Sequence, residues 1–263
     1  MRFVDSHAHL CLEAFDADRE AVLARARQAG MTRLLCIGSM VGDAEAARDL
    51  AERHPDVFFA AGLHPHDARH WTEAIRDRLD SLASHPRFLA LGEIGLDYHY
   101  NHSPPEAQRD VFRAQIRLAR ERGVPIVIHT REAHDDTLRI LSEEKASEAG
   151  GVFHCFSGNT AMAEFAVSHG FRVSFSGSLT FKNSAALREI AAHLQAEALL
   201  TETDSPFLSP HPHRGKRNEP ARTADVVACL AEIRGVTPEA MGEQTCRNFQ
   251  LAFPRLRGEP FKS

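Results

Sequence analysis

Short apolar runs alternate with longer polar segments of helical periodicity from one end of the chain to the other. The apolar runs are rich in Val, Ile, Leu, Phe and Ala, a composition that predicts buried strands. In the segments between them, apolar residues recur at the spacing of an amphipathic helix. Strands that alternate with helices are typical of repeated βα units around a parallel sheet.

Eight apolar runs are predicted to be strands, and four of the segments between them are clear crossover helices. The predicted strands are Arg2–His9, Arg33–Ser39, Val57–His64, Phe88–Glu93, Pro125–Thr130, Gly151–Phe156, Arg172–Ser178 and Leu199–Asp204. The predicted helices are Asp18–Ala29, Asp43–Arg53, Glu106–Arg122 and Ala185–His193. One conspicuous irregular segment, Ser205–Pro220, follows the eighth strand.

Eight βα units in 263 residues fit an α/β protein with a single (β/α)8 TIM barrel, which needs about 250 residues. We expect residues 1–263 to form one domain, because no linker or low-complexity tract divides the chain. An open doubly wound sheet shows the same alternation and is the structural alternative.

Composition and charge narrow the function classes. The net charge of −5 argues against a protein that coats nucleic acid through a general basic field, although a local basic patch is compatible with it. The glycine-rich segments form neither GxGxxG nor a P-loop, so no nucleotide cofactor is indicated. The longest apolar stretch, around Val57 to Ala61, is too short to cross a bilayer. We expect no membrane association and no obligate protein partner.

Five cysteines form no CxxC pair, and an odd number cannot all be paired within one chain. The chain runs from Met1 directly into Val4-Asp5-Ser6-His7, without the basic and apolar stretch of a secretory leader. We therefore expect reduced thiols and a cytoplasmic protein.

Side chains that can bind metals gather at the carboxyl ends of the predicted strands. They are His7 and His9 on the first strand, His64 on the third, Glu93 on the fourth, His129 on the fifth, His154 on the sixth, and Glu202 and Asp204 on the eighth. In a (β/α)8 barrel these ends meet at one mouth, where active sites form. The pattern predicts a metal centre whose ligands are His7, His9, Glu93, His129, His154 and Asp204.

His7 and His9 alternate along a strand, so both imidazoles can turn to the same face. A chain with 16 histidines contains such a pair by chance, so the signal comes from the other strand ends. Two further pairs enclose a proline and are interpreted as turns or loops: His64/His66 and His211/His213.

The two predicted ligands on the middle strands could also have purely structural roles. Glu93 lies between Gly92 and Gly95, which keep bulky groups away and let the carboxylate bridge two cations, but an exposed loop glutamate would look the same. His129 ends an apolar run, where a core histidine with a hydrogen-bond partner is the alternative.

The later strands continue the pattern. His154 also ends an apolar run, and Cys155 after it is expected to pack as a small hydrophobe rather than to bind metal. Pro206 prevents the eighth strand from continuing beyond Asp204. Glu202 shares the parity of Asp204 and could orient a ligand.

Seven motifs in order resemble the TatD family of metal-dependent deoxyribonucleases, within the amidohydrolase-like group of metal barrels. The motifs are Asp5–His9, Gly62–Pro65, Gly92–Tyr98, His129–Arg131, His154–Gly158, Thr201–Pro206 and Arg214–Pro220. The resemblance covers essentially the whole chain.

The resemblance implies a site for two divalent ions. Glu93 would bridge them, with one ion held by His7, His9 and Asp204 and the other by His129 and His154. The resemblance also implies that His64, Arg131 and Glu202 lie beside the metals or the substrate phosphate. The basic loop with Arg214, Lys216 and Arg217 could hold a nucleic-acid backbone, and a solvated loop is its alternative.

The implied activity is 3′→5′ removal of nucleotides from DNA, and in some members action on RNA or on amino acids esterified to tRNA. Our hypothesis is a water activated by two metals, with Asp204 as general base and Glu93 as the second catalytic residue. Imidazole ligands suit zinc, manganese or cobalt, whereas the resemblance implies activity with magnesium, so the metal stays open among Mg, Mn and Zn.

Two other functions stay open. One is hydrolysis of another ester or an amide in the same barrel, such as aminoacyl-tRNA or a cyclic amide. Glu93 stands where such enzymes often carry a modified lysine, which favours the phosphodiesterase. The other is a non-catalytic metal-binding scaffold with saturated coordination.

Overall fold

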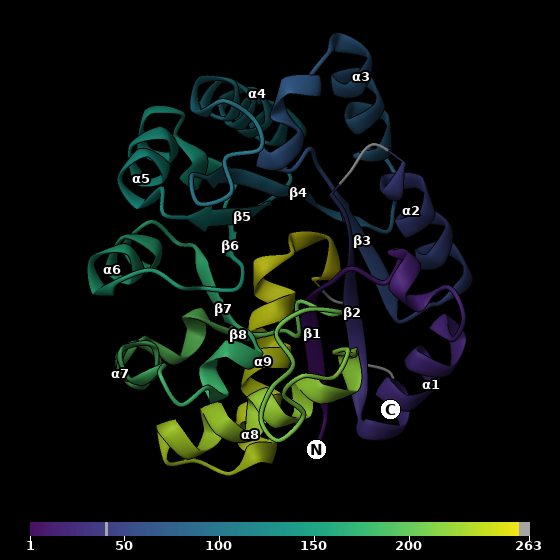
Figure 1. The fold of residues 1–263 in the computed structure, drawn as a ribbon, viewed down its shortest axis with the longest axis vertical. Coiled ribbons are helices and arrows are strands. Elements are labelled where there is room, and N and C mark those ends of the chain that lie inside the picture. The colour runs from purple at the N-terminus through teal and green to yellow at the C-terminus, as the bar shows by residue number, and fades with distance from the viewer. Residues whose placement is uncertain (40–41, 258–263) are drawn as a thin grey trace.

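The computed structural model describes residues 1–39 and 42–257, and its strands form one parallel sheet in chain order with helices around it (Figure 1). The strands are β1 (Phe3–Ala8), β2 (Met31–Gly38), β3 (Val57–Ala61), β4 (Phe88–Asp97), β5 (Ile126–Arg131), β6 (Gly151–Phe153), β7 (Arg172–Phe175) and β8 (Leu199–Thr201). The α-helices are α1 (Arg19–Ala29), α2 (Asp43–Arg53), α3 (Glu73–Leu82), α4 (Pro105–Arg122), α5 (His134–Glu143), α6 (Thr160–Ser168), α7 (Ala185–His193), α8 (Thr223–Arg234) and α9 (Pro238–Ala252).

The sheet closes where β1 meets the segment after β8. The backbone N–H of Asp204 donates to the carbonyl of His7 at 2.9 Å, and the N–H of His9 donates to the carbonyl of Ser205 at 2.8 Å. These bonds join the first and last strands at the mouth, so the predicted (β/α)8 barrel is confirmed and the open doubly wound sheet is excluded. The predicted span of one domain, residues 1–263, includes 40–41 and 258–263, which lie outside the described residues, and it stays a prediction.

Several strands end elsewhere than predicted. β3, β6, β7 and β8 all stop before the predicted residue. Beyond the ends of β6 and β8, Cys155 and Asp204 adopt left-handed backbone, with φ of 42° and 56°, which an extended strand does not contain. β4 instead runs past Glu93 to Asp97, since it stays paired with β5 up to Asp97 and Arg131.

The floor of the barrel is an apolar cluster covered by α9. Inward-facing side chains of the strands pack there against Phe249 and Phe253, whose rings lie 4.8 Å apart. Thr237 begins the helix by accepting a hydrogen bond from the N–H of Ala240, with Pro238 in the first turn. The C-terminal end of α9 is fixed by Arg255, whose guanidinium donates to carbonyl oxygens around the start of β4.

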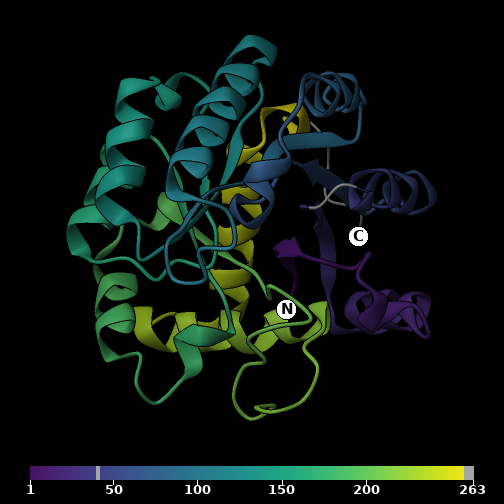
Figure 2. The same cartoon turned by 45° about the horizontal axis from the view of Figure 1, so that its top comes forward.

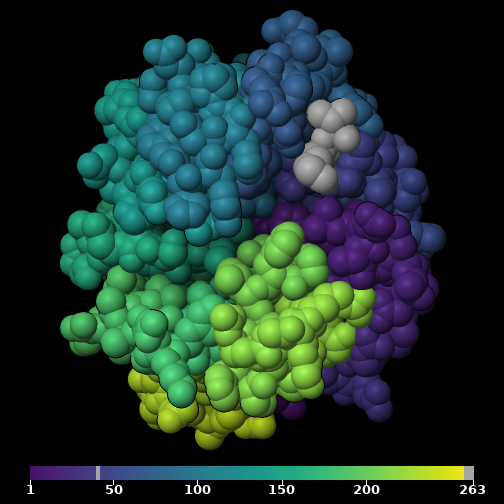
Figure 3. Space-filling view, viewed as in Figure 1, coloured from purple at the N-terminus to yellow at the C-terminus, as the bar shows by residue number. Residues whose placement is uncertain are grey.

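The segment between β8 and α8 forms a long loop beyond the ring of helices (Figure 2). It lies on the surface beside the N-terminal segment (Figure 3). Arg217 ties the two together, because its guanidinium donates to the carboxylate of Asp18 at 2.8 Å. Within the described ranges, no helix combines the length and apolar character needed to cross a membrane.

Candidate metal centre

Six side chains from five strands or their immediate continuations meet at the mouth. They are His7 and His9 at the end of β1, Glu93 within β4, His129 on β5, His154 just after β6 and Asp204 just after β8. The structure thus brings together all six predicted metal ligands. Neighbouring members of this set have polar atoms less than 4 Å apart.

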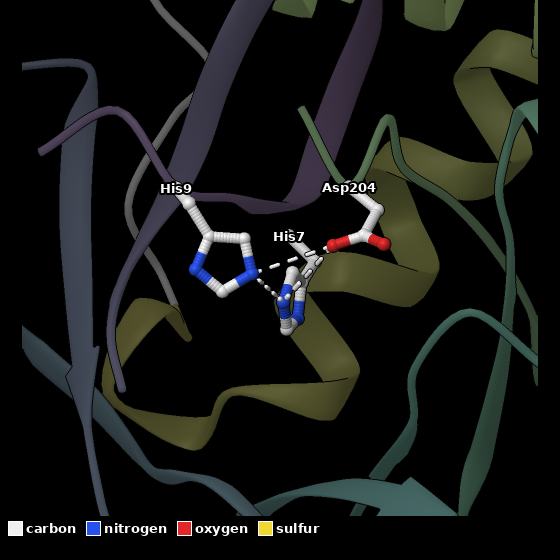
Figure 4. A group of neighbouring side chains, drawn as sticks. All are labelled: His7, His9 and Asp204. Carbon is white, nitrogen blue, oxygen red and sulfur yellow. Dashed lines mark hydrogen bonds and ion pairs between the residues drawn. The ribbon is translucent and has the colours of Figure 1, made fainter. Parts of the chain in front are cut away.

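One half of the centre is formed by His7, His9 and Asp204 (Figure 4). The two Nε2 atoms lie 3.1 Å apart, and Oδ1 of Asp204 lies 3.3 Å from Nε2 of His9 and 3.7 Å from Nε2 of His7. His7 is fully buried and His9 is 7% exposed. Three ligand atoms therefore face a common point between β1 and the segment after β8.

The other half is formed by His129 and His154. Nδ1 of His129 and Nε2 of His154 lie 3.3 Å apart, and each is 2.7 Å from Oε1 of Glu93. Again two imidazole nitrogens converge on a carboxylate.

Glu93 lies between the halves. Its Oε1 faces His129 and His154, while its Oε2 lies 3.4 Å from Nε2 of His7 and 3.6 Å from Nε2 of His9. A single carboxylate thus offers one oxygen to each half, which is the geometry a bridging ligand needs.

The position of Glu93 within β4 comes from a break in the strand. The pairing of β4 with β5 shifts between Leu91 and Ile94, and regular pairing resumes at Ile94. Gly95 allows the close approach there: its φ is +145°, and a Cβ would lie 1.9 Å from the carbonyl oxygen of His129. The prediction that Glu93 ends its strand was wrong. The flanking glycines allow β4 to lie close to β5, so β4 continues past Glu93.

The carboxylates are ionised despite their burial. Burial alone would raise the pKa of Glu93, but the facing imidazoles of His154 and His64 outweigh it and hold the pKa well below its usual value. Burial likewise raises the pKa of Asp204, but the hydrogen bond with His9 and the charge of His7 lower it overall. The facing imidazoles thus favour the charged form of both buried carboxylates.

The imidazoles respond to these charges in different ways. Burial lowers the pKa of His7, and proximity to His154 lowers it further. For His154, burial is outweighed by Glu93 and Glu202, which raise the pKa well above its usual value. For His9 and His129, burial is outweighed by carboxylate hydrogen bonds, and both pKa values are raised. The pocket attracts positive charge.

This donor set fits divalent cations. The ion-pair partners of Glu93 are the histidines His7, His9, His64, His129 and His154. Two imidazole nitrogens face each other at 3.1 Å in one half and at 3.3 Å in the other, and the neutral rings can donate lone pairs to a cation whose charge the carboxylates balance. Imidazole nitrogen with carboxylate oxygen is a common ligand combination for Zn²⁺ and Mn²⁺.

His64 also lies at the centre. Its Nε2 is 3.4 Å from Oε1 of Glu93, and burial lowers its pKa to about 4. The turn predicted for His64 and His66 is present, since a 3-10 helix, Pro65–His70, begins directly after His64. The pair His211/His213 lies in the loop between β8 and α8, where His213 is 3.6 Å from Asp225.

Glu202 supports His154 from behind. Its Oε1 lies 3.4 Å from Nδ1 of His154 and accepts a hydrogen bond from the backbone N–H of Cys155 at 2.7 Å. This contact orients the ring so that Nε2 faces Glu93. The Cys155 thiol lies 3.2 Å from the hydroxyl of Ser176, away from the ligand atoms.

Asp97 was not predicted as a site residue, although it belongs to a quoted motif. Its buried carboxylate lies 3.0 Å from Nε2 of His129 and 3.1 Å from Nε2 of His66. A hydrogen bond from Nε2 of His129 turns Nδ1 of the same ring toward Glu93. The signal was available, because Glu93 and Asp97 share strand parity, but the predicted strand stopped at Glu93.

Asp5 was also missed. Its carboxylate is fully buried and accepts hydrogen bonds from the N–H and the hydroxyl of Thr203 and from the N–H of His7. It therefore fixes the backbone on both sides of the His7 and Asp204 pair. Burial raises the pKa of Asp5 to about 7.

The predicted basic residues lie farther out. Arg131 ends β5 on the surface, with its guanidinium 4.7 Å from the ring centre of Tyr100. Arg214 lies 3.7 Å from the ring centre of Phe181, and Lys216 is exposed. Arg217 is engaged with Asp18 and holds the loop in place.

Comparisons with known proteins identify relatives of this chain. A family model described as TatD related DNase matches residues 4–254. The chain is 40% identical to the metal-dependent hydrolase YabD of Bacillus subtilis, over 95% of this chain and 98% of that protein. It is 35% identical to the 3′-5′ ssDNA/RNA exonuclease TatD of Enterobacter lignolyticus, over 95% and 98% of the two chains. The crystal structure of YjjV, a TatD homologue from Escherichia coli, superimposes with a TM-score of 0.91 at 29% identity, covering 96% of this chain and 98% of that one.

Proposed function

The chain belongs to the TatD related DNase family of metal-dependent hydrolases, and from this premise we propose that it removes nucleotides from the 3′ end of DNA, and of RNA, by hydrolysing phosphodiester bonds. The observation that carries the proposal is Glu93, which presents one oxygen to each of two clusters of imidazole nitrogens. Paired cation sites that share a carboxylate suit phosphoryl transfer, in which both the attacking and the leaving oxygen need charge stabilisation.

We assign the ligands from the two halves of the centre. His7, His9 and Asp204 would hold one ion, His129 and His154 the other, and Glu93 would bridge them. When bound, divalent ions supply Lewis-acid charge that polarises the phosphate and lowers the pKa of a water molecule. The metal is Mg²⁺, Mn²⁺ or Zn²⁺.

Asp204 is the side chain that we assign to proton transfer. Asp204 carries a carboxylate at the rim, 13% exposed, and is placed to accept the proton of the attacking water. The water oxygen bonds to phosphorus, and the bond from phosphorus to the 3′ oxygen of the preceding nucleotide breaks. That oxygen takes up a proton from solvent, and Asp204 returns its proton to solvent, which yields a 5′-mononucleotide and a shortened chain with a 3′ hydroxyl.

Other polar residues would orient the metal ligands or bind the substrate. His64 and Glu202 lie against Glu93 and His154, so we assign them to orienting the ligands. Arg131, Arg214 and Lys216 would contact the phosphate backbone, whereas Arg217 would act by holding the loop against Asp18.

The test uses a 5′-labelled single-stranded oligonucleotide with each metal added back to metal-free protein. We expect a ladder of products shortened from the 3′ end, and no ladder with Asp204→Asn. Charged tRNA and a panel of cyclic amides serve as competing substrates. Hydrolysis of these without any shortening of DNA or RNA would contradict the proposal and favour the ester or amide hydrolase.

We also propose a reducing compartment, the cytoplasm, as the site of action. The five cysteines are free thiols, and the sulfur atoms of Cys11 and Cys36 lie 3.8 Å apart without a bond. Cell fractionation with thiol trapping tests this, and a disulfide in freshly trapped protein would contradict it.

A further inference from the structure

Two exposed aromatic rings lie at the mouth. Among residues 1–39 and 42–257, the large apolar side chains that are most exposed are Met1, Tyr100, Phe207, Val236 and Leu251. Tyr100 and Phe207 are the aromatic members of this set, and each is 53% exposed. Single exposed apolar residues are common, so exposure alone indicates no binding site, and the contacts of these two rings matter more.

Phe207 is held directly beside the first half of the centre. Its ring centre lies 6.0 Å from that of His9, and its backbone N–H donates to the carbonyl of Asp204 at 2.9 Å. The buried amide of Asn218 donates to the carbonyl of Phe207 at 2.7 Å and to that of Thr203 at 2.9 Å. The ring is therefore open to solvent on a backbone that is fixed.

Tyr100 is held beside the second half. Its backbone N–H donates to Oδ1 of Asp97 at 2.9 Å, and the other oxygen of that carboxylate contacts His129. His102 lies parallel to the Tyr100 ring at 5.7 Å, and the guanidinium of Arg131 lies 4.7 Å from the ring centre. Tyr100 thus combines an exposed aromatic ring with a cation, as sites for single-stranded nucleic acids do.

The two rings are linked to different oxygens of Glu93. The Phe207 ring contacts His9, whose Nε2 lies 3.6 Å from Oε2 of Glu93. The backbone of Tyr100 contacts Asp97, and Asp97 contacts His129, whose Nδ1 lies 2.7 Å from Oε1 of Glu93. In the space-filling view, the light-green segment after β8 and the blue segments before and along α4 border a recess on this face (Figure 3). A phosphodiester held by the cations that Glu93 would bridge has one nucleoside on each side.

We propose that Phe207 and Tyr100 stack the two nucleobases that flank the scissile phosphate, one ring to each base. The inference rests on the proposed function and adds a specificity device to it. Stacking accepts every base because each has a flat π face, so the device reads no sequence. It requires that both bases be unpaired, which selects single strands and frayed 3′ ends.

The test compares oligonucleotides that carry an abasic residue at the 3′-terminal or at the penultimate position with the intact strand. We expect wild-type protein to prefer the intact strand by about 5- to 150-fold in kcat/KM at each position, the usual contribution of one stacked base. Phe207→Ala and Tyr100→Ala should each abolish this preference at one position, and the two variants should do so at different positions. On a strand abasic at both positions, each variant should match wild type.

Matched variants separate stacking from other effects. Phe207→Tyr should keep the preference, whereas Phe207→Leu, which is apolar without a π face, should lose it. Leu251→Ala removes an equally exposed apolar side chain from α9 and should change nothing. An equal loss on intact and abasic strands, loss at the same position in both variants, or no preference in wild type would overturn the proposal.

A binding experiment keeps the two proposals distinguishable. Asp204→Asn protein is mixed with a strand that carries 2-aminopurine at either position, and stacking should quench its fluorescence. The added Phe207→Ala or Tyr100→Ala substitution should relieve the quenching at one position each. If no strand is shortened by wild type, the proposed function fails, whereas binding without ring-dependent quenching refutes the stacking alone.

Discussion

At the floor of the barrel, strands meet α9 through apolar side chains such as Val4, Phe58 and Leu200, whereas at the mouth the same strands carry imidazoles and carboxylates. β2 and β3 pair without a slip from Leu34 to Gly38, whereas the register slips in the body of the barrel between Phe3 and Val4 and between Phe59 and Ala60. Near the mouth the register slips between Asp5 and Ala8 and between Leu91 and Ile94. Packing at the floor provides stability, and the slips near the mouth place the candidate ligands where a regular ladder would not.

The comparison predicts that substitutions at the mouth change activity and metal binding, while those at the floor change stability. Glu93→Gln is the largest test, because this side chain contacts both halves of the centre. We expect kcat/KM to fall by about 10⁴-fold or more while the circular dichroism spectrum and cooperative unfolding are retained. Glu121→Gln, an exposed carboxylate on α4, is the control and should have wild-type activity. Normal turnover by the Glu93→Gln protein would contradict the proposal that Glu93 bridges two cations.

Phe249→Ala tests the floor. Phe249 is fully buried in the cluster under α9, so its truncation should leave a cavity and lower the free energy of unfolding by about 3–5 kcal/mol. Chemical denaturation measures this, and kcat/KM per folded molecule should stay at the wild-type value. Leu251→Ala on the same helix should cost less than about 0.5 kcal/mol. If Phe249→Ala instead reduced turnover of stably folded protein, the two ends of the barrel would not be separable.

Asp97→Asn addresses a residue that acts through a ligand. The amide is a weaker acceptor for Nε2 of His129, so metal affinity should fall by about 10- to 100-fold, and activity should partly recover at saturating metal. Competition with a chelating dye measures the affinity directly. Asp110→Asn, exposed on α4, is the matched control. Unchanged affinity would show that Asp97 does not position His129.

The pH dependence gives the smallest expected effect. In metal-free protein the pKa values of His9 and His129 are raised: burial lowers them, but hydrogen bonds to Asp204 and Asp97 respectively, with Glu93, outweigh it. A raised folded pKa means that protonation stabilises the metal-free fold fully below the unfolded value near 6.5, and that this stability is lost as the pH rises through the folded pKa. Metal binding needs the neutral rings and so has the opposite pH dependence.

The increase in Tm caused by added metal should therefore shrink as the pH falls from 8 to 6, by a few degrees. Thermal melts with and without Mn²⁺ at each pH measure it, with metal content determined in parallel. A constant increase in Tm across this range, with metal retained at pH 5, would contradict the assignment of imidazole ligands.

Much of this arrangement could be predicted from the sequence because it depends on local patterns. Helices Asp43–Arg53 and Ala185–His193 have the bounds that their periodicity predicts. The family and the barrel predicted from ordered motifs and alternating strands are confirmed. Asp97 was not predicted as a site residue because its position depends on how far β4 stays paired with β5. The sequence of one strand alone does not determine that pairing.

The sequence by itself determined the alternation of strands and helices, the chemical types of the ligands, and the strands that carry them. Only the tertiary structure decided which ligand atoms face one another, that Glu93 turns one oxygen to each half, and that Arg217 holds a loop instead of facing the mouth. The physical reason is distance along the chain. Periodicity is set by neighbouring residues, whereas the contact of His7 with Asp204 exists only after the barrel has closed.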